Sequence, residues 1–381
     1  MKITLDRTPE QVELIKAMAS KNRDVAYEAQ TALAEFIGPV LAEVINTAPT
    51  VSNMFSALQF NSDESPSIPL DLYHDITDED YIQVWSQSVP GGLPTNQVAP
   101  SQSELKFTTY TLDSALSFDK RYASRSRLDV VSKTFTRMAQ EILLKQEKTS
   151  ATMIMSALAN ASTNNEKHII RSAQAGRFLL SDLNKLFTKA KRINTAWNGG
   201  TPAERRGRGI TDILVSPEIV EEIRGLAYNP INTIGGAGGA PTAGDGIAAT
   251  DSMRDAVFNS AGIPEFYGVS ILEFNEMGVN QKWNTVFGTA AVGKAFDDNY
   301  SVQANGGTAQ GILGTEQVIV GVDLSRESMI RAIATDSESG EEFSLIADDQ
   351  FVTRQSKIGY YGSLEEGRMI IDDRVLLGLI V

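Results

Sequence analysis

A chain of 381 residues, 42% of them apolar and 22% charged, has room for two or three compact units and lacks the composition of a disordered protein. Its net charge of −14 disfavours duplex nucleic acid and anionic membranes as tight partners, and the absence of cysteine excludes disulfides, thiolate chemistry and Cys-ligated zinc. Residues 1–7 lack the features of a signal peptide, and no run approaches the roughly 20 apolar residues of a membrane-spanning helix. We therefore expect a soluble protein made in the cytoplasm.

The first predicted element is a pair of helices within residues 9–45. Apolar residues recur there at steps of three and four, as they do on one face of a helix. Thr8-Pro9 resembles a helix start, with Thr as the cap and Pro at the first helical position. Gly38-Pro39 predicts a break or kink in the second helix. The next segment offers these helices no evident partner, so we expect an arm that packs on something else.

Residues 60–115 form a turn-rich segment with several prolines and a Gly91-Gly92 pair. Two strand-like pieces, Tyr81–Trp85 and Leu105–Leu112, bracket the turn-rich tip. This pattern predicts a long β-hairpin that projects from the body. A hairpin with so little core of its own is stable only when a neighbouring molecule covers it.

The longest helical signal runs from Leu128 to about Ala161. Apolar residues follow at steps of three and four, and no Pro or Gly interrupts them. At 1.5 Å per residue such a helix is roughly 50 Å long, well beyond an ordinary globular helix. A second helix is predicted from Ser181, a plausible cap, to about Trp197.

The remaining chain predicts a mixed region followed by strands. A short strand at Ile213–Val215 leads into a helix that starts at Ser216-Pro217, and residues 230–250 predict a long loop rich in Gly and Ala. Further strands are predicted at 269–274, 285–287, 317–322, 329–334, 351–353, 358–362, 368–371 and 375–381. No internal repeat is found.

This order of elements resembles that of tailed-phage major capsid proteins of the HK97-like type, over nearly the whole chain. Residues 113–119 look like the strand that leads from that family's extended loop into its spine helix. Residues 212–218 look like the strand, proline and helix of its axial domain.

The likeness is strongest in the last sixty or so residues. Gln317–Asp323 is expected to open a hairpin that Ile330–Ile333 continues. Residues 349–354 and 357–362 look like the closing strands of the family's peripheral domain. No single stretch is a strict signature, so the resemblance rests on the ordered set.

The resemblance implies an α+β, HK97-like capsid fold with five parts. Residues 1–59 would be the N-terminal arm and 60–115 the extended β-hairpin loop. Residues 116–169, which contain the long spine helix, and 321–381 would form the peripheral domain, and 170–320 the axial domain.

The implied function is structural. A major capsid protein self-assembles, as hexamers and pentamers, into the icosahedral phage head that encloses the double-stranded DNA genome. The implied partners are scaffolding, portal and decoration proteins, with packaged DNA held only weakly and no membrane. The implied location is the virion, after assembly in the cytoplasm of the bacterial host. Some family members carry a fused N-terminal scaffolding region; here the arm begins almost at Met1, so we expect a separate scaffolding protein or none.

One motif imitates a nucleotide site. Gly288–Ala295 fits the Gly-x-x-x-x-Gly-Lys frame of a phosphate-binding loop. However, Ala295 stands where a hydroxyl should hold Mg²⁺, and the residues after it open no convincing helix for the phosphates. We interpret the stretch as small residues in a buried strand.

The remaining polar candidates also favour structural roles. His74 and His168, the only two histidines, lie in different contexts, so neither a catalytic triad nor a histidine-rich metal site is indicated. Asp78–Asp80 matches no calcium loop, and the basic cluster Glu204–Arg208 suits a salt bridge between subunits. The sequence thus predicts no enzyme, no catalytic residue, no cofactor and no metal site.

Two alternatives stay open. An encapsulin-like compartment shell shares the fold and would enclose a protein cargo. An unrelated α/β enzyme is the rival from another class, and the lack of a convergent acid, base, nucleophile or metal set counts against it.

Overall fold

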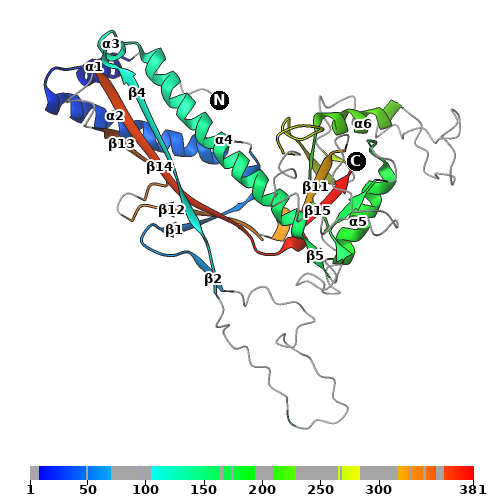
Figure 1. Ribbon diagram of the computed structural model, residues 1–381. Helices are drawn as coiled ribbons and strands as arrows, with labels where there is room; N and C mark the ends of the chain where they lie inside the picture. The colour runs from blue at the N-terminus through cyan, green and yellow to red at the C-terminus, as the bar shows by residue number, and fades with distance from the viewer. Residues whose placement is uncertain are drawn as a thin grey trace. The chain divides into compact units, whose positions relative to one another are not determined.

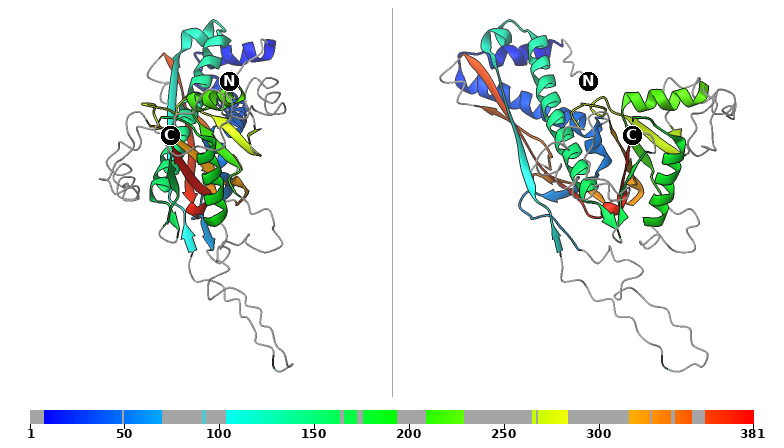
Figure 2. Two further views of the ribbon diagram at one scale, coloured as in Figure 1. Left: turned by 90° about the vertical axis from the view of Figure 1, so that its right-hand side faces the viewer. Right: turned by 45° about the vertical axis from the view of Figure 1, so that its right-hand side comes forward.

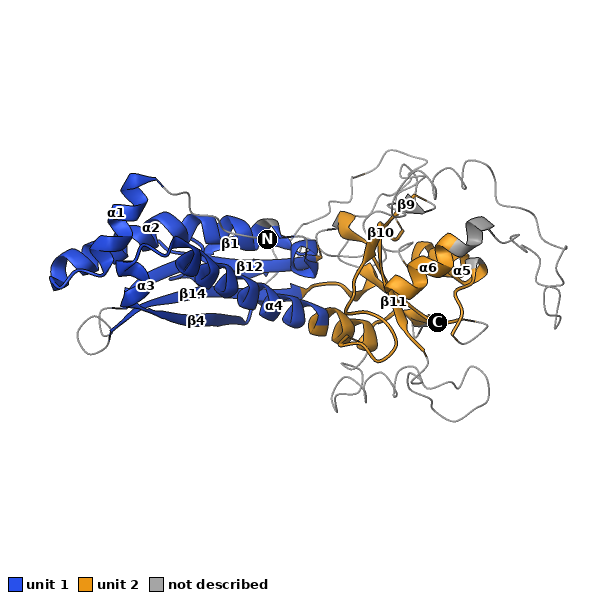
Figure 3. Ribbon diagram, turned by 90° about the horizontal axis from the view of Figure 1, so that it is seen from above, with its two compact units in different colours: residues 1–68, 105–151, 329–369 blue, residues 69–104, 152–328, 370–381 orange. Residues whose placement is uncertain are grey.

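The computed structural model describes residues 8–48, 50–69, 92, 104–163, 166–172, 176–193, 209–228, 265–266, 268–283, 316–326, 328–337, 340–348 and 356–381. The chain divides into two compact units, coloured separately in Figure 3. Unit 1 comprises residues 1–68, 105–151 and 329–369, and unit 2 comprises 69–104, 152–328 and 370–381. Each unit is therefore assembled from segments far apart in the sequence.

Unit 1 begins with the two expected helices, α1 (Pro9–Met18) and α2 (Arg23–Thr47). The Thr8 side chain caps α1 by accepting from the Gln11 N–H at 3.4 Å, as predicted, and Pro9 is its first residue. The sequence predicted a break or kink at Gly38-Pro39, and the break is wrong, because α2 continues through Pro39. The buried side chains Ile37 and Leu41 flank the proline, and their packing offsets the lost backbone hydrogen bond.

A five-stranded sheet forms the other layer of unit 1 (Figure 1). Its strands are β1 (Ser56–Asn61), β12 (Met329–Thr335), β14 (Lys357–Ile370), β13 (Ser344–Asp348) and β4 (Thr109–Asp119). β1 and β12 are parallel, whereas β14 pairs antiparallel with β13 on one side and with all of β4 on the other. Two predicted strands, at 358–362 and 368–371, are one long strand in the structure, because β14 runs unbroken through both.

The expected hairpin between Gln317–Asp323 and Ile330–Ile333 is wrong. The first stretch contains β11 (Val318–Val322), which pairs with strands of unit 2, and the second lies in β12 of unit 1. A short 3-10 turn, Leu324–Arg326, separates them. Two strands that are close in sequence need not pair with each other when each pairs with other strands, as β11 does with β15 and β12 does with β1.

The long helix is confirmed as α4 (Leu128–Asn160), preceded by the short α3 (Lys120–Ser124). Figures 1 and 2 show α4 running alongside the β4–β14 pair. The core between them is aromatic: the ring of Tyr360 lies 5.3 Å from that of Phe135, edge to face, and 6.2 Å from that of Phe118. Gly362 of β14 leaves the space that Met138 and Phe343 occupy.

The segment between β2 and β3 has a defined base. β2 (Ser67–Pro69) pairs with β3 (Glu104–Lys106), and the Phe107 N–H donates to the Pro66 carbonyl at 3.0 Å. The chain thus leaves and returns at one place. Between these strands only residue 92 is described, so the predicted strand Tyr81–Trp85 and the tip lie outside the described residues.

Unit 2 is built on a six-stranded mixed sheet in the order β7-β15-β11-β8-β10-β9. Its strands are Ile169–Arg171, Leu376–Ile380, Val318–Val322, Asp212–Val215, Val269–Glu273 and Glu265–Phe266, in that order. Every residue of β11 and of β15 is buried, as expected of strands covered on both faces. The unit also contains a small β5–β6 hairpin (Ser162–Thr163 and Glu166–Lys167).

Two helices supply the rest of the core of unit 2: α5 (Leu180–Ile193) and α6 (Pro217–Tyr228). The predicted strand, proline and helix at residues 212–218 are confirmed as β8 followed by α6. β15 pairs with β7 and β11 of this unit, whereas the sequence-based division grouped residues 321–381 together. The predicted loop at 230–250 and the strands at 285–287 and 351–353 lie outside the described residues.

Candidate functional site: a buried ionic cluster

A buried group of charges lies in unit 1, centred on Glu366 of β14. The Glu366 side chain is 0% exposed. Its Oε2 atom accepts from Arg331 Nε of β12 at 3.1 Å and from Arg368 Nη2 of β14 at 3.0 Å, and Arg368 Nη1 also donates to Oε1. One carboxylate therefore pairs with two guanidinium groups away from water.

Neutral side chains from other elements complete this cluster. The Tyr110 hydroxyl of β4 donates to Glu366 Oε1 at 2.9 Å, and Gln146 Nε2 of α4 donates to Oε2 at 3.0 Å. Arg368 Nη2 donates to Ser52 Oγ at 2.6 Å, in the 3-10 turn η1 (Val51–Met54) that follows α2. The cluster thus joins β4, α4, β12, β14 and the end of the arm.

A second carboxylate balances the charge. Asn46 of α2 donates through Nδ2 to Glu342 and accepts from Arg331 Nη1 at 3.4 Å, and Gln59 Nε2 of β1 donates to Glu342 Oε1 at 2.6 Å. Asn46 therefore links the half-buried Glu342 to Arg331. Buried charges are tolerated when they are paired and hydrogen-bonded in this way.

Burial sets the protonation of the cluster. Desolvation lowers the pKa of Arg331, and the charge of Glu366 opposes that shift. Desolvation likewise raises the pKa of Tyr110 to about 12, against the opposing charge of Arg368. Tyr110 therefore stays a neutral phenol that can donate to Glu366 at physiological pH. Because the central carboxylate has no exposed surface, the cluster joins elements of the fold and offers no surface to a substrate.

His168 is the buried polar group of the β7 edge in unit 2. Its Nδ1 atom lies 3.0 Å from the Leu376 carbonyl and 3.1 Å from the Asp373 carbonyl, so Nδ1 carries a proton and donates to both. Asp373 Oδ2 also accepts from the Ser162 N–H at 3.1 Å. Desolvation lowers the pKa of His168, and the charge of Asp373 opposes the shift. The hydrogen bonds of the His168 ring therefore link the start of β15 to the residue that precedes β7.

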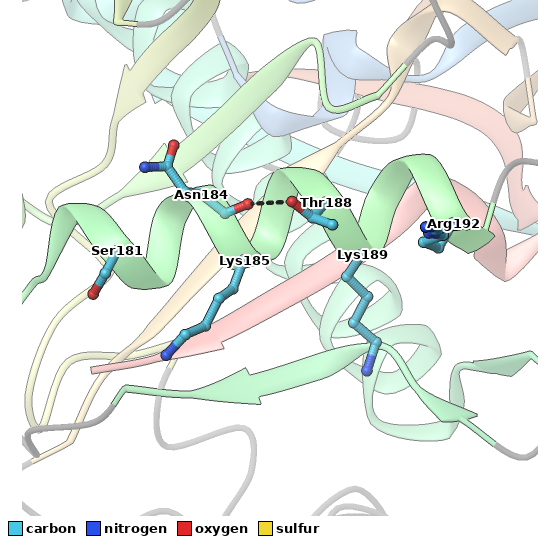
Figure 4. Close-up of a pocket in the computed structure, with 6 residues that line it drawn as sticks. All are labelled: Ser181, Asn184, Lys185, Thr188, Lys189 and Arg192. Carbon is cyan, nitrogen blue, oxygen red and sulfur yellow. Dashed lines mark hydrogen bonds between the residues drawn. The ribbon is translucent and has the colours of Figure 1, made fainter.

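An open depression of about 450 Å³ lies on the outer side of α5 (Figure 4). It is lined by residues of this helix alone: Ser181, Asn184, Lys185, Thr188, Lys189 and Arg192. The Thr188 hydroxyl donates to the Asn184 carbonyl at 2.9 Å, and Lys185 Nζ pairs with Asp182 Oδ1 at 2.9 Å. Among the described residues no second element lines the depression, so this part of the chain gives it no enclosed, many-sided lining of the kind that a ligand site has.

Most polar candidates from the sequence lie outside the described residues. These are Gly288–Ala295, His74, Asp78–Asp80 and Glu204–Arg208. Within the described ranges, no group of three His, Asp or Glu side chains is placed to hold a metal ion, and no helix is both long and apolar enough to span a bilayer.

Sequence reasoning missed the ionic cluster. One signal was available: Arg331 interrupts the apolar run Met329–Ala334, and Glu366 and Arg368 stand in a strand-like stretch. A charge inside a buried strand calls for a partner, but the sequence does not say which residue supplies it.

A comparison with protein-family models finds no match, and a comparison with curated protein sequences finds none either. Solved structures do match, and many of them are phage capsids or heads. The chain is 12% identical to the capsid protein of a native GTA particle, with a TM-score of 0.48 over 88% of this chain and 91% of that chain.

Two further matches are a phage capsid protein and an encapsulin. The capsid protein of Cyanophage P-SCSP1u is 13% identical, with a TM-score of 0.46 over 86% of each chain. The SrpI encapsulin of Synechococcus elongatus PCC 7942 is 11% identical, with a TM-score of 0.44 over 86% of this chain and 85% of that chain.

Proposed function

We propose that this chain is the major capsid protein of a tailed phage, which self-assembles into the icosahedral head that encloses a double-stranded DNA genome. It acts by tiling as hexamers and pentamers and carries out no catalysis. Scaffolding, portal and decoration proteins are its proposed partners, packaged DNA is bound only weakly, and assembly takes place in the host cytoplasm before the protein resides in the virion.

The observation that carries this proposal is the anchored base of the segment between β2 and β3. β2 and β3 hold its two ends together, and the strands next to them in the chain, β1 and β4, belong to the sheet of unit 1. Tyr110 at the start of β4 donates to the buried Glu366, and Gln59 of β1 donates to Glu342. A segment that leaves a rigid body and returns to the same place is suited to reach another molecule.

The order of the described elements supports the same assignment of parts. The arm would be residues 1–59, the extended loop 60–115, the peripheral domain 116–169 with 321–381, and the axial domain 170–320. In this assignment α4 is the spine helix and β8 and β10 lie in the axial domain, whose sheet also includes β15 from residues 321–381. Many weak contacts of arm and loop with neighbouring copies then multiply into a stable shell.

The test replaces residues 70–103 by an Asn-Gly turn between Pro69 and Glu104. Because β2 and β3 already pair, a two-residue turn can close them as a hairpin. We expect a subunit with unchanged circular dichroism and thermal midpoint that forms no shells by negative-stain microscopy, whereas the unmodified chain, expressed alone or with its phage, forms them.

Two outcomes would contradict the proposal. Shells formed by the shortened chain would show that the loop is not the assembly element, and an unmodified chain that stays monomeric under all conditions, including infection, would remove the assembly function itself. The nucleic-acid content of purified particles separates a phage head from a compartment that encloses protein.

A further inference from the structure

The outer edge of β4 is a long strand edge without a described partner. β4 pairs with β14 on one side along its full length, from Thr109 opposite Gly367 to Asp119 opposite Lys357. No strand in the described part of the chain pairs with the other side. Figure 3 shows β4 along one margin of unit 1. Every second residue of such an edge presents its N–H and C=O groups outward.

This edge also lacks the devices that usually block one. Natural edge strands carry lysine, proline or a bulge that prevents another strand from adding. From Tyr110 to Phe118 the sequence contains no lysine, arginine or proline, and Asp113 is its one charged residue. The ladder to β14 is continuous, so β4 has no bulge. The edge is therefore open to strand addition.

The sequence of β4 is nearly symmetric about Ser114. Leu112 and Leu116 stand at equal distances from it, and so do the pair Thr111 and Ser117 and the aromatic pair Tyr110 and Phe118. An antiparallel pair of such strands, related by a twofold axis at Ser114, would place leucine opposite leucine, a hydroxyl residue opposite a hydroxyl residue and an aromatic residue opposite an aromatic residue at these positions.

We propose that β4 pairs antiparallel with β4 of a second copy of this chain, with Ser114 opposite Ser114, and that this is a twofold contact of the assembled particle. The inference rests on the proposed assembly function and names one contact within it. A strand edge that is its own partner makes an isologous interface, in which the same surface is used by both copies.

Charge and burial agree with this register. Asp113 would face Ala115 and Asp119 would face Thr109, so no like charges stand directly opposite. Residues paired across antiparallel strands lie on the same face of the sheet. Thr111 and Ser117 are both exposed, whereas Leu112 and Leu116 are both half-buried, so the two faces match across the axis.

The absence of cysteine allows a direct test by disulfide cross-linking. Two single variants are made, Thr111→Cys and Ser117→Cys, both at exposed positions. In the proposed register residue 111 of one copy faces residue 117 of the other, within reach of a disulfide. Two copies of residue 111 are six strand positions apart, roughly 20 Å, and cannot be bridged. The same holds for two copies of residue 117.

We expect an equimolar mixture of the two variants, co-assembled and oxidised, to give on the order of tenfold more cross-linked dimer than either variant alone. Ser114→Cys, which lies on the axis, should link to itself. Cross-linking of either single exposed variant to the same extent as the mixture would indicate another register and overturn the inference.

Electron microscopy of the same samples separates this inference from the proposed function. Particles without cross-linking in the mixture or in Ser114→Cys would overturn the β4 contact and leave the assembly function standing. Absence of both particles and cross-links would overturn both. Circular dichroism of each variant checks that the subunit is folded.

Discussion

The two units of the molecule provide different kinds of partner for their buried polar groups. In unit 1, Arg331, Glu366 and Arg368 are almost completely removed from water, and both arginines pair with Glu366. In unit 2, the buried Asp182 pairs with Lys185, whose side chain is 58% exposed, and His168 is hydrogen-bonded to carbonyl groups. A sealed cluster fails as a whole when one charge is lost, whereas an ion pair that reaches the surface can be rehydrated.

The largest expected effect removes the central charge of the sealed cluster. Glu366→Gln keeps the size of the side chain but leaves two buried guanidinium groups without their carboxylate. We expect a loss of about 3–5 kcal/mol in the free energy of unfolding of unit 1, measured by urea denaturation followed by circular dichroism. The neighbouring Glu365→Gln, at a half-buried position, should change it by less than about 0.5 kcal/mol. Equal effects of the two substitutions would show that stability depends no more on the buried carboxylate of Glu366 than on the half-buried one of Glu365.

An intermediate effect compares how tightly the two sheets are packed. In Gly362→Ala of unit 1 the new methyl group would lie 2.6 Å from Phe343 Cζ and also against Met138. In Gly321→Ala of unit 2 it would lie 2.8 Å from Cδ1 at the end of the Ile210 side chain. Overpacking costs about 1–3 kcal/mol, and we expect Gly362→Ala at the upper end because an aromatic ring cannot turn aside as the Ile210 side chain can.

Urea denaturation of both glycine variants measures this difference. A larger loss for Gly321→Ala than for Gly362→Ala would reverse the comparison and would place the tighter packing in unit 2.

The smallest expected effect concerns pH and unit 2. Burial lowers the pKa of His168 below its ordinary value of 6.5, so the unfolded chain binds more protons than the folded chain once the pH falls through 6.5. The contribution of neutral His168 is therefore complete above about pH 6.5 and is lost progressively below it, with a slope of at most about 1.4 kcal/mol per pH unit.

Urea midpoints between pH 7.5 and pH 5 test this dependence. His168→Gln should be less stable at pH 7.5 and should show a flatter decline toward pH 5. A decline as steep in the variant as in the unmodified chain would assign the pH dependence to other groups.

The sequence predicted the helices and strands of this fold better than it predicted which of them pair or pack together. The long helix α4 was predictable because its apolar spacing is regular and nothing interrupts it, and β8 with α6 was predictable from the proline after the strand. Pro39 misled because local chemistry favours a break there, while the burial of Ile37 and Leu41 holds the helix together. Tertiary packing overrode the local signal.

Pairing over long distances could not be predicted in the same way. β11 and β12 are close in sequence and were expected to pair, yet β12 lies beside β1, whose residues precede it by more than two hundred positions, as in the pair Ser56 and Ile330. The ionic cluster also depends on contacts between distant parts of the sequence, since Arg331, Gln146 and Tyr110 come together by donating to Glu366. Neither the helix and strand propensities of the residues nor the spacing of apolar residues indicates which distant segments pair.

The parallel pairing of β1 with β12 has a consequence for the order of events on the ribosome. Synthesis proceeds at about 5–20 residues per second, so β1 waits roughly tens of seconds before its partner strand emerges. Unit 2 is likewise incomplete until β15 has been made, because β7 pairs with β15, as in Ile169 and Gly378. Neither sheet can therefore close before these late strands emerge, and β1 stays without its partner strand β12 during that interval.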